Sequence, residues 1–337
     1  MKIPRNAFKV CRSAAAGLPP RFRCLFVALA FAASAAPAQQ YPLKTVRIIA
    51  TEAGGSTDIV ARTIGPRLSA RWNQPVVVEN RGGAAGIIGA ELAAKAPADG
   101  YTLFIGHTGT LAINPSLYKS LPYDPVRDFA PIALILATPL IVVVHPALPV
   151  KSMNELIAAA REKPGEIAYS SSGSGTASHL ASELLNDVAK IRTLHIPFRG
   201  TAPAITAVVS GEVAFMFSAQ ASTLPLIKAG KLRAIAYTGS ARSAEQPDLP
   251  TVSEAGLPGF EVINWQGFLV PAGVPRDIVA RLHADIVATL AAPEVRSRLS
   301  TGGSQIVGNT PEQFGAFIRS EINKWAGVVR SANIKAD

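Results

Sequence analysis

The sequence predicts an α/β protein whose parallel-rich sheets form two lobes. After residue 38, strand-like and helix-like segments alternate through nearly the whole chain, which favours parallel sheets with helices on both faces. Residues 141–144 form a continuous β-branched run, as expected for a strand that is buried on both faces. Roughly 300 residues remain after residue 38, and a core of that size divides most naturally between two lobes.

The first 38 residues have the layout of a secretory signal peptide. A basic stretch without acidic residues precedes an apolar run at residues 25–35, and Ala36-Pro37-Ala38 follows. The apolar run is too short to span a bilayer, and Cys24 precedes it, whereas a lipoprotein signal places a cysteine after it. We therefore expect a cleavable signal peptide over residues 1–38, export to the periplasm, and a mature chain that begins at Gln39 or Gln40.

Removal of that segment changes what the composition implies. It contains six lysine or arginine residues and no acid, so the formal net charge falls from +10 to +4, and the excess of basic residues gives no support for nucleic-acid binding. Both cysteines, Cys11 and Cys24, leave with it. A mature chain without cysteine has no disulfide, thiol nucleophile or cysteine metal site, which fits a bacterial periplasmic protein whose core needs no cross-links.

The first set of elements is expected between residues 46 and 144. Strands are predicted at residues 46–50, 76–79, 101–106 and 141–144, and helices at residues 57–71 and 86–96. In the first helix, Ile59, Ile64 and Leu68 are expected to face the core. The strand at residues 101–106 begins after an Asp99-Gly100 turn.

A second set is expected from residue 152 onward. Ser152 with Glu155 predicts a capping box on a helix that stops at Pro164-Gly165. Strands are predicted at residues 167–170, 194–196, 213–217, 232–237 and 262–270, and helices at residues 177–189, 202–210 and from near residue 275. The string Thr310-Pro311-Glu312-Gln313 predicts the cap of a last long helix.

Glycine-containing turns follow several of these strands, at residues 53–57, 106–109, 170–176 and 199–201. In open parallel sheets, ligands bind beyond the carboxyl ends of the strands, and free backbone amides there attract anions. The first turn lacks the lysine of a phosphate-binding P-loop and the G-x-G-x-x-G pattern of a dinucleotide fold. A plain strand-to-helix turn, with Asp58 complementing the helix dipole, is the alternative interpretation.

No catalytic group of residues accompanies these turns. The sequence contains no G-x-S-x-G string, which a hydrolase nucleophile elbow requires. His179 and Glu183 share a helix face, but no third ligand stands at useful spacing, so we expect a hydrogen-bonded structural histidine. The other histidines are scattered singly, at His107, His145, His195 and His283. The sequence therefore favours a binding protein without metal or cofactor over an enzyme.

Longer strings of the mature chain carry a family resemblance. They include VRIIATEAGGSTDIVAR, QPVVVENRGGAAGIIGAELAAKAPADGYTL, INPSLYKSLPYDPVRDFAPI, GSGTASHLASELL, PAITAVVSGEV and PAGVPRDIVARL. In these strings the chain resembles the Bug-type extracytoplasmic solute receptors of tripartite tricarboxylate transporters. The resemblance covers essentially all of the mature chain, in order and with natural spacing.

The resemblance implies a periplasmic binding protein fold, with two α/β lobes around a central ligand cleft and two crossing strands as the hinge. It places residues 39–142 and 262–337 in lobe 1 and residues 143–261 in lobe 2. Members of this family hold a carboxylate of a small organic acid with backbone amides and hydroxyls from a turn in each lobe. Carried onto this chain, the ligand-binding residues are Thr51, Glu52, Gly54, Gly55, Ser56, Thr57, Thr108, Gly109, Asn114, Ser172, Gly173, Gly175, Thr176, Phe198, Arg199, Gly200, Ser218 and Gln220.

Three features depart from the family pattern. Thr51 replaces a cleft aromatic residue, and Glu52 adds an acid beside it. Ser218 stands where an acid is common, and Arg199 where lysine is usual. These positions differ among members with different ligands, so the departures concern the identity of the ligand and leave the expected fold intact.

The implied function is capture of a small carboxylate, such as an organic, amino or aromatic acid, and its delivery to a membrane permease of the tripartite tricarboxylate type. A second interpretation keeps the fold but has the loaded receptor dock a sensor kinase. A third is an exported hydrolase, which the missing elbow and missing thiol disfavour. The expected partners are thus the solute and a membrane protein, with no nucleic acid, and the chain is expected to be a monomer.

Overall fold

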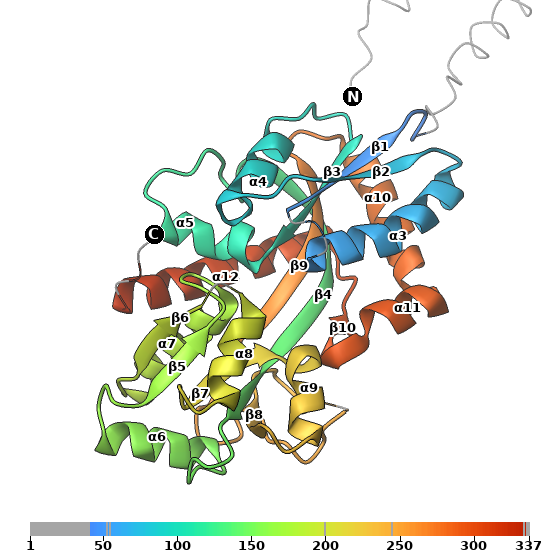
Figure 1. The fold of residues 1–337 in the computed structure, drawn as a ribbon. Helices are drawn as coiled ribbons and strands as arrows, with labels where there is room; N and C mark the ends of the chain where they lie inside the picture. The colour runs from blue at the N-terminus through green and yellow to red at the C-terminus, as the bar shows by residue number, and fades with distance from the viewer. Residues whose placement is uncertain are drawn as a thin grey trace, which may run out of the picture. The chain divides into compact units, whose positions relative to one another are not determined.

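The computed structural model describes residues 41–51, 53, 55–198, 200–243, 245–332 and 334. Residues Lys44–Asp337 form one compact unit of alternating strands and helices (Figure 1). The expected signal peptide at residues 1–38 lies outside the described residues, as do Glu52, Gly54 and Arg199.

Ten strands in the described residues form a mixed sheet that two lobes share. In chain order they are β1 (Val46–Ala50), β2 (Val76–Asn80), β3 (Thr102–His107), β4 (Phe129–Val144), β5 (Ala168–Ser171), β6 (Leu194–Pro197), β7 (Phe215–Ala219), β8 (Arg233–Tyr237), β9 (Ile263–Pro271) and β10 (Gln305–Ile306). The order across the sheet is β2-β1-β3-β9-β4-β7-β5-β6, and β8 and β10 also pair with β4. The outer strands pair in parallel, as the sequence predicts. Strands β4 and β9 add antiparallel pairings that strand–helix alternation does not reveal.

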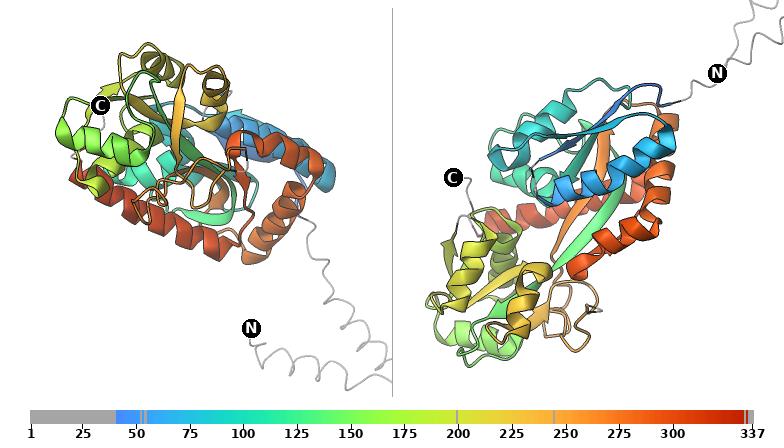
Figure 2. Two further views of the ribbon diagram at one scale, coloured as in Figure 1. Left: turned by 90° about the horizontal axis from the view of Figure 1, so that it is seen from below. Right: turned by 45° about the vertical axis from the view of Figure 1, so that its right-hand side comes forward.

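The long strand β4 links the two lobes. Residues 129–139 pair with β9, and residues 140–144 pair with β7 and β8. Pro139 has no backbone N–H to donate to a ladder, and the change of partner follows directly after it. Figure 2 shows β4 and β9 running between the two groups of elements. We propose that the lobes divide near Pro139 and Ile263, close to the boundaries expected at 142/143 and 261/262.

Helices occupy most of the connections between these strands. They are α3 (Ser56–Trp72), α4 (Ile87–Ala94), α5 (Asn114–Leu117), α6 (Met153–Glu162), α7 (Ala177–Ala189), α8 (Thr201–Val209), α9 (Gln220–Lys228), α10 (Arg276–Leu290), α11 (Pro293–Leu299) and α12 (Pro311–Ser331), with short helical turns η1 (Ala84–Gly86), η2 (Gly109–Ile113) and η3 (Thr301–Gly303). Helix α12 packs against β4 and also against α7. The last helix therefore contacts both lobes.

Residues 141–144 are buried on both faces of the sheet, as their β-branched composition predicts. Ile141 and Val143 pack in one apolar cluster, together with Val208 of α8. Val142 and Val144 point the opposite way and pack in a second, larger cluster, because successive side chains of a strand alternate between its faces. All four side chains are fully buried.

The buried face of α3 differs from the expected one at a single position. Val60, Ile64 and Leu68 are spaced four residues apart and are almost fully buried, because such residues lie on one helix face. The predictions for Ile64 and Leu68 are confirmed. The prediction for Ile59 is wrong: its side chain is 46% exposed, since a residue five positions before Ile64 lies off this face.

Both predicted helix caps are present, one of them in altered form. At α12, Thr310 Oγ1 accepts from the Gln313 N–H (3.2 Å) and Gln313 Oε1 accepts from the Thr310 N–H (3.0 Å), which completes the capping box. At α6, Ser152 Oγ accepts from the Glu155 N–H (3.2 Å). The Glu155 carboxylate, however, accepts from the backbone N–H of Lys151. The reciprocal bond of that box is thus displaced by one residue.

Candidate functional site

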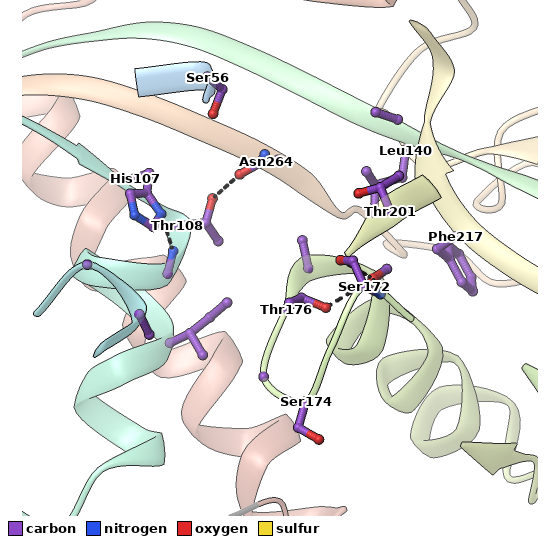
Figure 3. A pocket seen from close by; sticks show the side chains of 18 of the residues that line it. Ser56, His107, Thr108, Leu140, Ser172, Ser174, Thr176, Thr201, Phe217 and Asn264 are labelled. Carbon is purple, nitrogen blue, oxygen red and sulfur yellow. Dashed lines mark hydrogen bonds between the residues drawn. The ribbon is translucent and has the colours of Figure 1, made fainter. Parts of the chain in front are cut away.

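A cavity of about 550 Å³ lies where strand ends of both lobes meet. Its volume falls in the range of about 300–1,000 Å³ that small-molecule sites occupy. Figure 3 shows Ser56, His107, Thr108 and Asn264 on one side, and Ser172, Ser174, Thr176 and Thr201 on the other. Both lobes therefore supply polar groups to the same space.

The lobe 1 wall includes the turn between β1 and α3. Thr51 and Ser56 line the cavity. Thr57 is fully buried behind them, and its Oγ1 accepts a hydrogen bond from the Thr51 backbone N–H (3.2 Å). The N-cap residue of α3 is Gly55, and no described side chain caps the first amides of the helix, which leaves them available to a ligand.

A left-handed turn between β2 and α4 forms the next part of this wall. Gly83, Ala84, Ala85 and Gly86 all have positive φ, including 46° at Ala84 and 53° at Ala85. An L-residue adopts this conformation at a cost of about 1–2 kcal/mol. The buried Asn114 holds the turn, because its Nδ2 donates to the Ala85 carbonyl (3.2 Å). Asn114 also lines the cavity, so it is both part of the wall and a brace.

The end of β3 places His107, Thr108 and Gly109 in the wall. The backbone N–H of Gly109 donates to His107 Nδ1 (3.1 Å), and burial lowers the pKa of His107 to about 4. Thr108 Oγ1 accepts from the backbone N–H of Trp265 (2.9 Å) and donates to Asn264 Oδ1 (3.4 Å). These bonds tie the wall to the linking strand β9.

The lobe 2 wall centres on the loop at residues 172–176. Ser172, Ser174, Gly175 and Thr176 line the cavity. Ser178 Oγ braces the loop, since it lies 3.1 Å from Ser172 Oγ and 3.0 Å from Thr176 Oγ1. The helix start at α7 and the loop before it are therefore held together by hydroxyl groups.

Two stacked histidine rings lie directly behind this loop. The rings of His179 and His195 have centroids 3.9 Å apart and are within 8° of parallel. Burial, reinforced by the neighbouring His195, lowers the pKa of His179 to about 3. His195 Nε2 lies 2.6 Å from Ser171 Oγ, and the Tyr169 ring stacks on His195 at 4.9 Å.

The same pair of rings supports the loop backbone. The Gly175 N–H donates to His179 Nδ1 (3.0 Å), so His179 is the hydrogen-bonded structural histidine that the sequence predicts. Glu183, its expected neighbour on the helix face, accepts a hydrogen bond from the Tyr169 hydroxyl (2.5 Å).

Strand β7 and the helices beside it complete the lobe 2 wall. Thr201, Phe217, Ser218 and Ser222 line the cavity here. Ser218 Oγ is buried and has no hydrogen-bond partner among the described residues. Buried hydroxyls without a partner are uncommon. At the edge of a cavity, a bound solute or a water molecule can supply such a bond.

The described lining residues carry no charged side chain: lysine, arginine, aspartate and glutamate are all absent from them. Several helices begin at the cavity instead. Among them are α3, α7 and α8, whose residues Ser56, Ala177 and Thr201 line it. Within the described residues, none of these three helices has a side-chain cap. Free first-turn amides and the positive end of the helix dipole favour an anion.

The cavity brings together nine of the eighteen residues predicted for the site. They are Thr51, Ser56, Thr108, Gly109, Asn114, Ser172, Gly175, Thr176 and Ser218. Glu52, Gly54 and Arg199 lie outside the described residues.

The remaining six predicted residues do not line the cavity and have other roles. Gly55 and Gly200 are the N-cap residues of α3 and α8. Thr57 supports Thr51, and the Gly173 carbonyl accepts a hydrogen bond from Thr176 Oγ1. Phe198 packs against the apolar cluster around Ile141. Gln220 is fully buried, because its amide bonds to the side chains of Glu245 and Ser243. It therefore ties α9 to the loop after β8.

Sequence reasoning missed several lining residues. His107 was grouped with the scattered histidines, although its place at the end of a strand, just before Thr108-Gly109, was a usable signal. Asn264 lies within the linking strand β9 and had no turn signal beside it. The turn at residues 83–86 was not among the predicted turns, and its positive φ angles at two alanines have no mark in the sequence.

No group of three His, Cys, Asp or Glu side chains in the described part of the chain is arranged to hold a metal ion. Within those same residues, every helix is too short or too polar to cross a bilayer.

Comparisons with known proteins agree with this architecture. The family model described as "Tripartite tricarboxylate transporter family receptor" matches residues 60–334. The protein BugT of Bordetella pertussis is 36% identical over 313 residues, which cover 92% of this chain and 96% of BugT. A solved Rhodopseudomonas palustris protein with adipate shares 34% identity and a TM-score of 0.74, covering 88% of this chain and 99% of that one. MatC of the same species, solved with bound malate, shares 34% identity and a TM-score of 0.72, covering 86% and 100%. The chain is therefore a solute-binding receptor and not an enzyme, and it belongs to the tripartite tricarboxylate transporter receptor family.

Proposed function

We propose that this receptor captures a small carboxylate in the periplasm and delivers it to a membrane permease. The observation that carries the proposal is the meeting of three uncapped helix N-termini at one cavity whose described lining has no charged side chain. Such a site stabilises an anion through backbone dipoles and hydrogen bonds.

Hydrogen-bond donors come from both walls of the cavity. Ser56 on the lobe 1 side, and Ser174 and Thr201 on the lobe 2 side, line it with hydroxyl groups that make no hydrogen bond to the described residues. A carboxylate offers about four acceptor positions, and hydrogen bonds to an ionised acceptor are roughly twice as strong as neutral ones. A small acid that bridges the walls thus gains bonds that neither lobe provides alone.

The relatives support both the ligand class and the partner. Two solved proteins of similar sequence are described with adipate and with bound malate, which are small carboxylates. Delivery to a permease rests on the family to which the chain belongs. We expect the ligand of this chain to be an acid of comparable size.

A thermal-shift screen of the mature protein against small organic acids tests the proposal. A ligand present at about 100 times its Kd stabilises the folded state by roughly 2.7 kcal/mol, which raises the melting temperature by a few degrees in a chain of this size. Each acid is paired with its methyl ester or amide as a matched control. The acids should raise the melting temperature and the uncharged derivatives should not. Equal shifts with esters, or no shift with any acid, would contradict the proposed anion site.

A further inference from the structure

The protonation state of the His107 ring is set by its neighbours. The backbone N–H of Gly109 donates to Nδ1 at 3.1 Å, so Nδ1 is the unprotonated nitrogen of the ring. Burial lowers the pKa of His107 to about 4, and the ring is therefore neutral near pH 7. A neutral imidazole with an unprotonated Nδ1 has its one proton on Nε2.

Nε2 lies beside the glycine turn that forms part of the lobe 1 wall of the cavity. His107 and Gly86 both line the cavity, and a Cβ placed on Gly86 would stand 3.3 Å from His107 Nε2. Among the residues that the structure describes, none accepts a hydrogen bond from Nε2. A ring donor at a cavity wall without a protein acceptor needs a partner from inside the cavity.

We propose that the Nε2–H of His107 donates a hydrogen bond to the bound solute from the lobe 1 wall, so that the solute must carry a hydrogen-bond acceptor at this position. A carboxylate, carbonyl or hydroxyl oxygen satisfies this donor, whereas an ammonium or amide N–H in the same position leaves two donors facing each other. The inference rests on the proposed function and adds to it the polarity of the solute group that lies against β3. Because the ring is neutral, it selects by hydrogen-bond direction and adds no charge.

Two substitutions separate this role from support of the wall. In His107→Asn, the side-chain Oδ1 takes the place of Nδ1 and can accept from Gly109, but the Nε2–H donor is gone. In His107→Gln, the longer side chain brings an N–H to the place of Nε2, but the Gly109 amide loses its acceptor. The first variant removes the proposed contact with the solute, and the second removes only the internal hydrogen bond.

The experiment measures the affinity and the ligand-free melting temperature of each variant. Titration calorimetry uses adipate, malate and the acid that gives the largest shift in the screen. For acids that bind wild type, we expect His107→Asn to bind about 10- to 100-fold more weakly, as for the loss of a hydrogen bond to a charged group, with a melting temperature close to wild type. His107→Gln should keep most of the affinity and melt at a lower temperature.

Other outcomes would overturn the inference in different ways. If wild type binds an acid and His107→Asn binds it equally well, the donor role is wrong while the proposed function stands. If both variants lose affinity and melting temperature together, His107 only supports the wall. If no acid binds wild type, the proposed function fails, and this inference fails with it.

Discussion

Acid should destabilise this protein through His179, the buried histidine behind the lobe 2 loop. Its Nδ1 accepts a hydrogen bond from Gly175, and its ring stacks on His195 at 3.9 Å. The other titratable groups around this pair are Tyr169, which stacks on His195, and Glu183, which accepts from the Tyr169 hydroxyl. Protonating His179 at Nδ1 would remove the acceptor of Gly175 and place a charge in a buried stack, so the folded protein resists it.

The size of the effect follows from the pKa of His179 in the two states. In the unfolded chain the pKa is close to its ordinary value of 6.5, and in the folded protein it is lowered to about 3. Between these values unfolding takes up one proton, so the free energy of unfolding falls by about 1.4 kcal/mol for each pH unit of acidification. Well above the pKa that His179 has in the unfolded chain, this residue adds no pH dependence to the free energy of unfolding. From about pH 7.5 to about pH 4.5, the loss due to His179 is roughly 2.7 kcal/mol.

Urea unfolding of wild type and His179→Asn at about pH 7.5 and about pH 4.5 tests this value. The Asn side chain keeps an acceptor for Gly175 but does not titrate, so its loss of stability over the interval should be smaller by roughly 2.7 kcal/mol. Contributions from groups that do not interact with His179 occur in both proteins and cancel. Ser182→Ala, on the same buried face of α7, is a control for simple destabilisation and should keep the wild-type pH dependence. Equal losses in wild type and His179→Asn would refute the reasoning.

Three further predictions follow from other parts of the structure. Glu321, buried in α12, accepts from the indole N–H groups of Trp265 (2.8 Å) and Trp325 (3.1 Å) and pairs with Lys324; Glu321→Leu should cost about 3–5 kcal/mol in urea unfolding, and Glu321→Gln clearly less. Gly175→Val should abolish the thermal response to acids, because φ is +75° and a Cβ would lie 2.7 Å from Leu117 Cδ2. Gly165→Val is the control, with φ of +82° and no neighbour within 4 Å. It should lose a similar amount of folding stability through backbone strain but keep the thermal response to acids. Closure about β4 and β9 should reduce the radius of gyration in small-angle scattering on addition of a binding acid, and an unchanged radius at saturation would speak against it.

Local sequence signals predicted most elements of the fold but missed helices α5, α9 and α11, and long-range pairing explains the strand residues that they missed. The complete Thr310 capping box and the β-branched run at residues 141–144 were predictable because each depends on a few adjacent residues. The first twelve residues of β4 were not predicted, and they include Pro131 and Pro139, which disfavour a central strand. What holds them in a strand is pairing with β9, about 130 positions later in the chain. The antiparallel pairings of β4 and β9 have the same origin.

Some residues of the site could be predicted from local turn sequences, and others reach the cavity only through contacts between distant parts of the chain. Thr51, Ser56 and the loop at residues 172–176 follow predicted strands, and a glycine turn at a strand end is a local signal. Asn264 reaches the cavity only because β9 crosses beside Thr108. Gln220 was expected in the site from the family resemblance, yet its side chain turns inward to Glu245. Neighbours of that kind decide side-chain direction, and they are remote in sequence.

The absence of charged side chains from the described lining bears on how loading would be coupled to closure. In the proposed site, the charge of the acid is met by the N-termini of α3, α7 and α8, each of which contributes about 0.3–1 kcal/mol at exposed positions and up to about 2 kcal/mol when partly buried. Helix α3 belongs to lobe 1, and α7 and α8 belong to lobe 2, so the full set of contacts requires both lobes to meet the ligand. A lysine or arginine on one lobe would hold the acid in the open state as well. A ligand shifts a conformational equilibrium only by its difference in affinity for the two states. Helix dipoles contributed by both lobes make the affinity of the closed state exceed that of the open state by more than a single charged side chain on one lobe would.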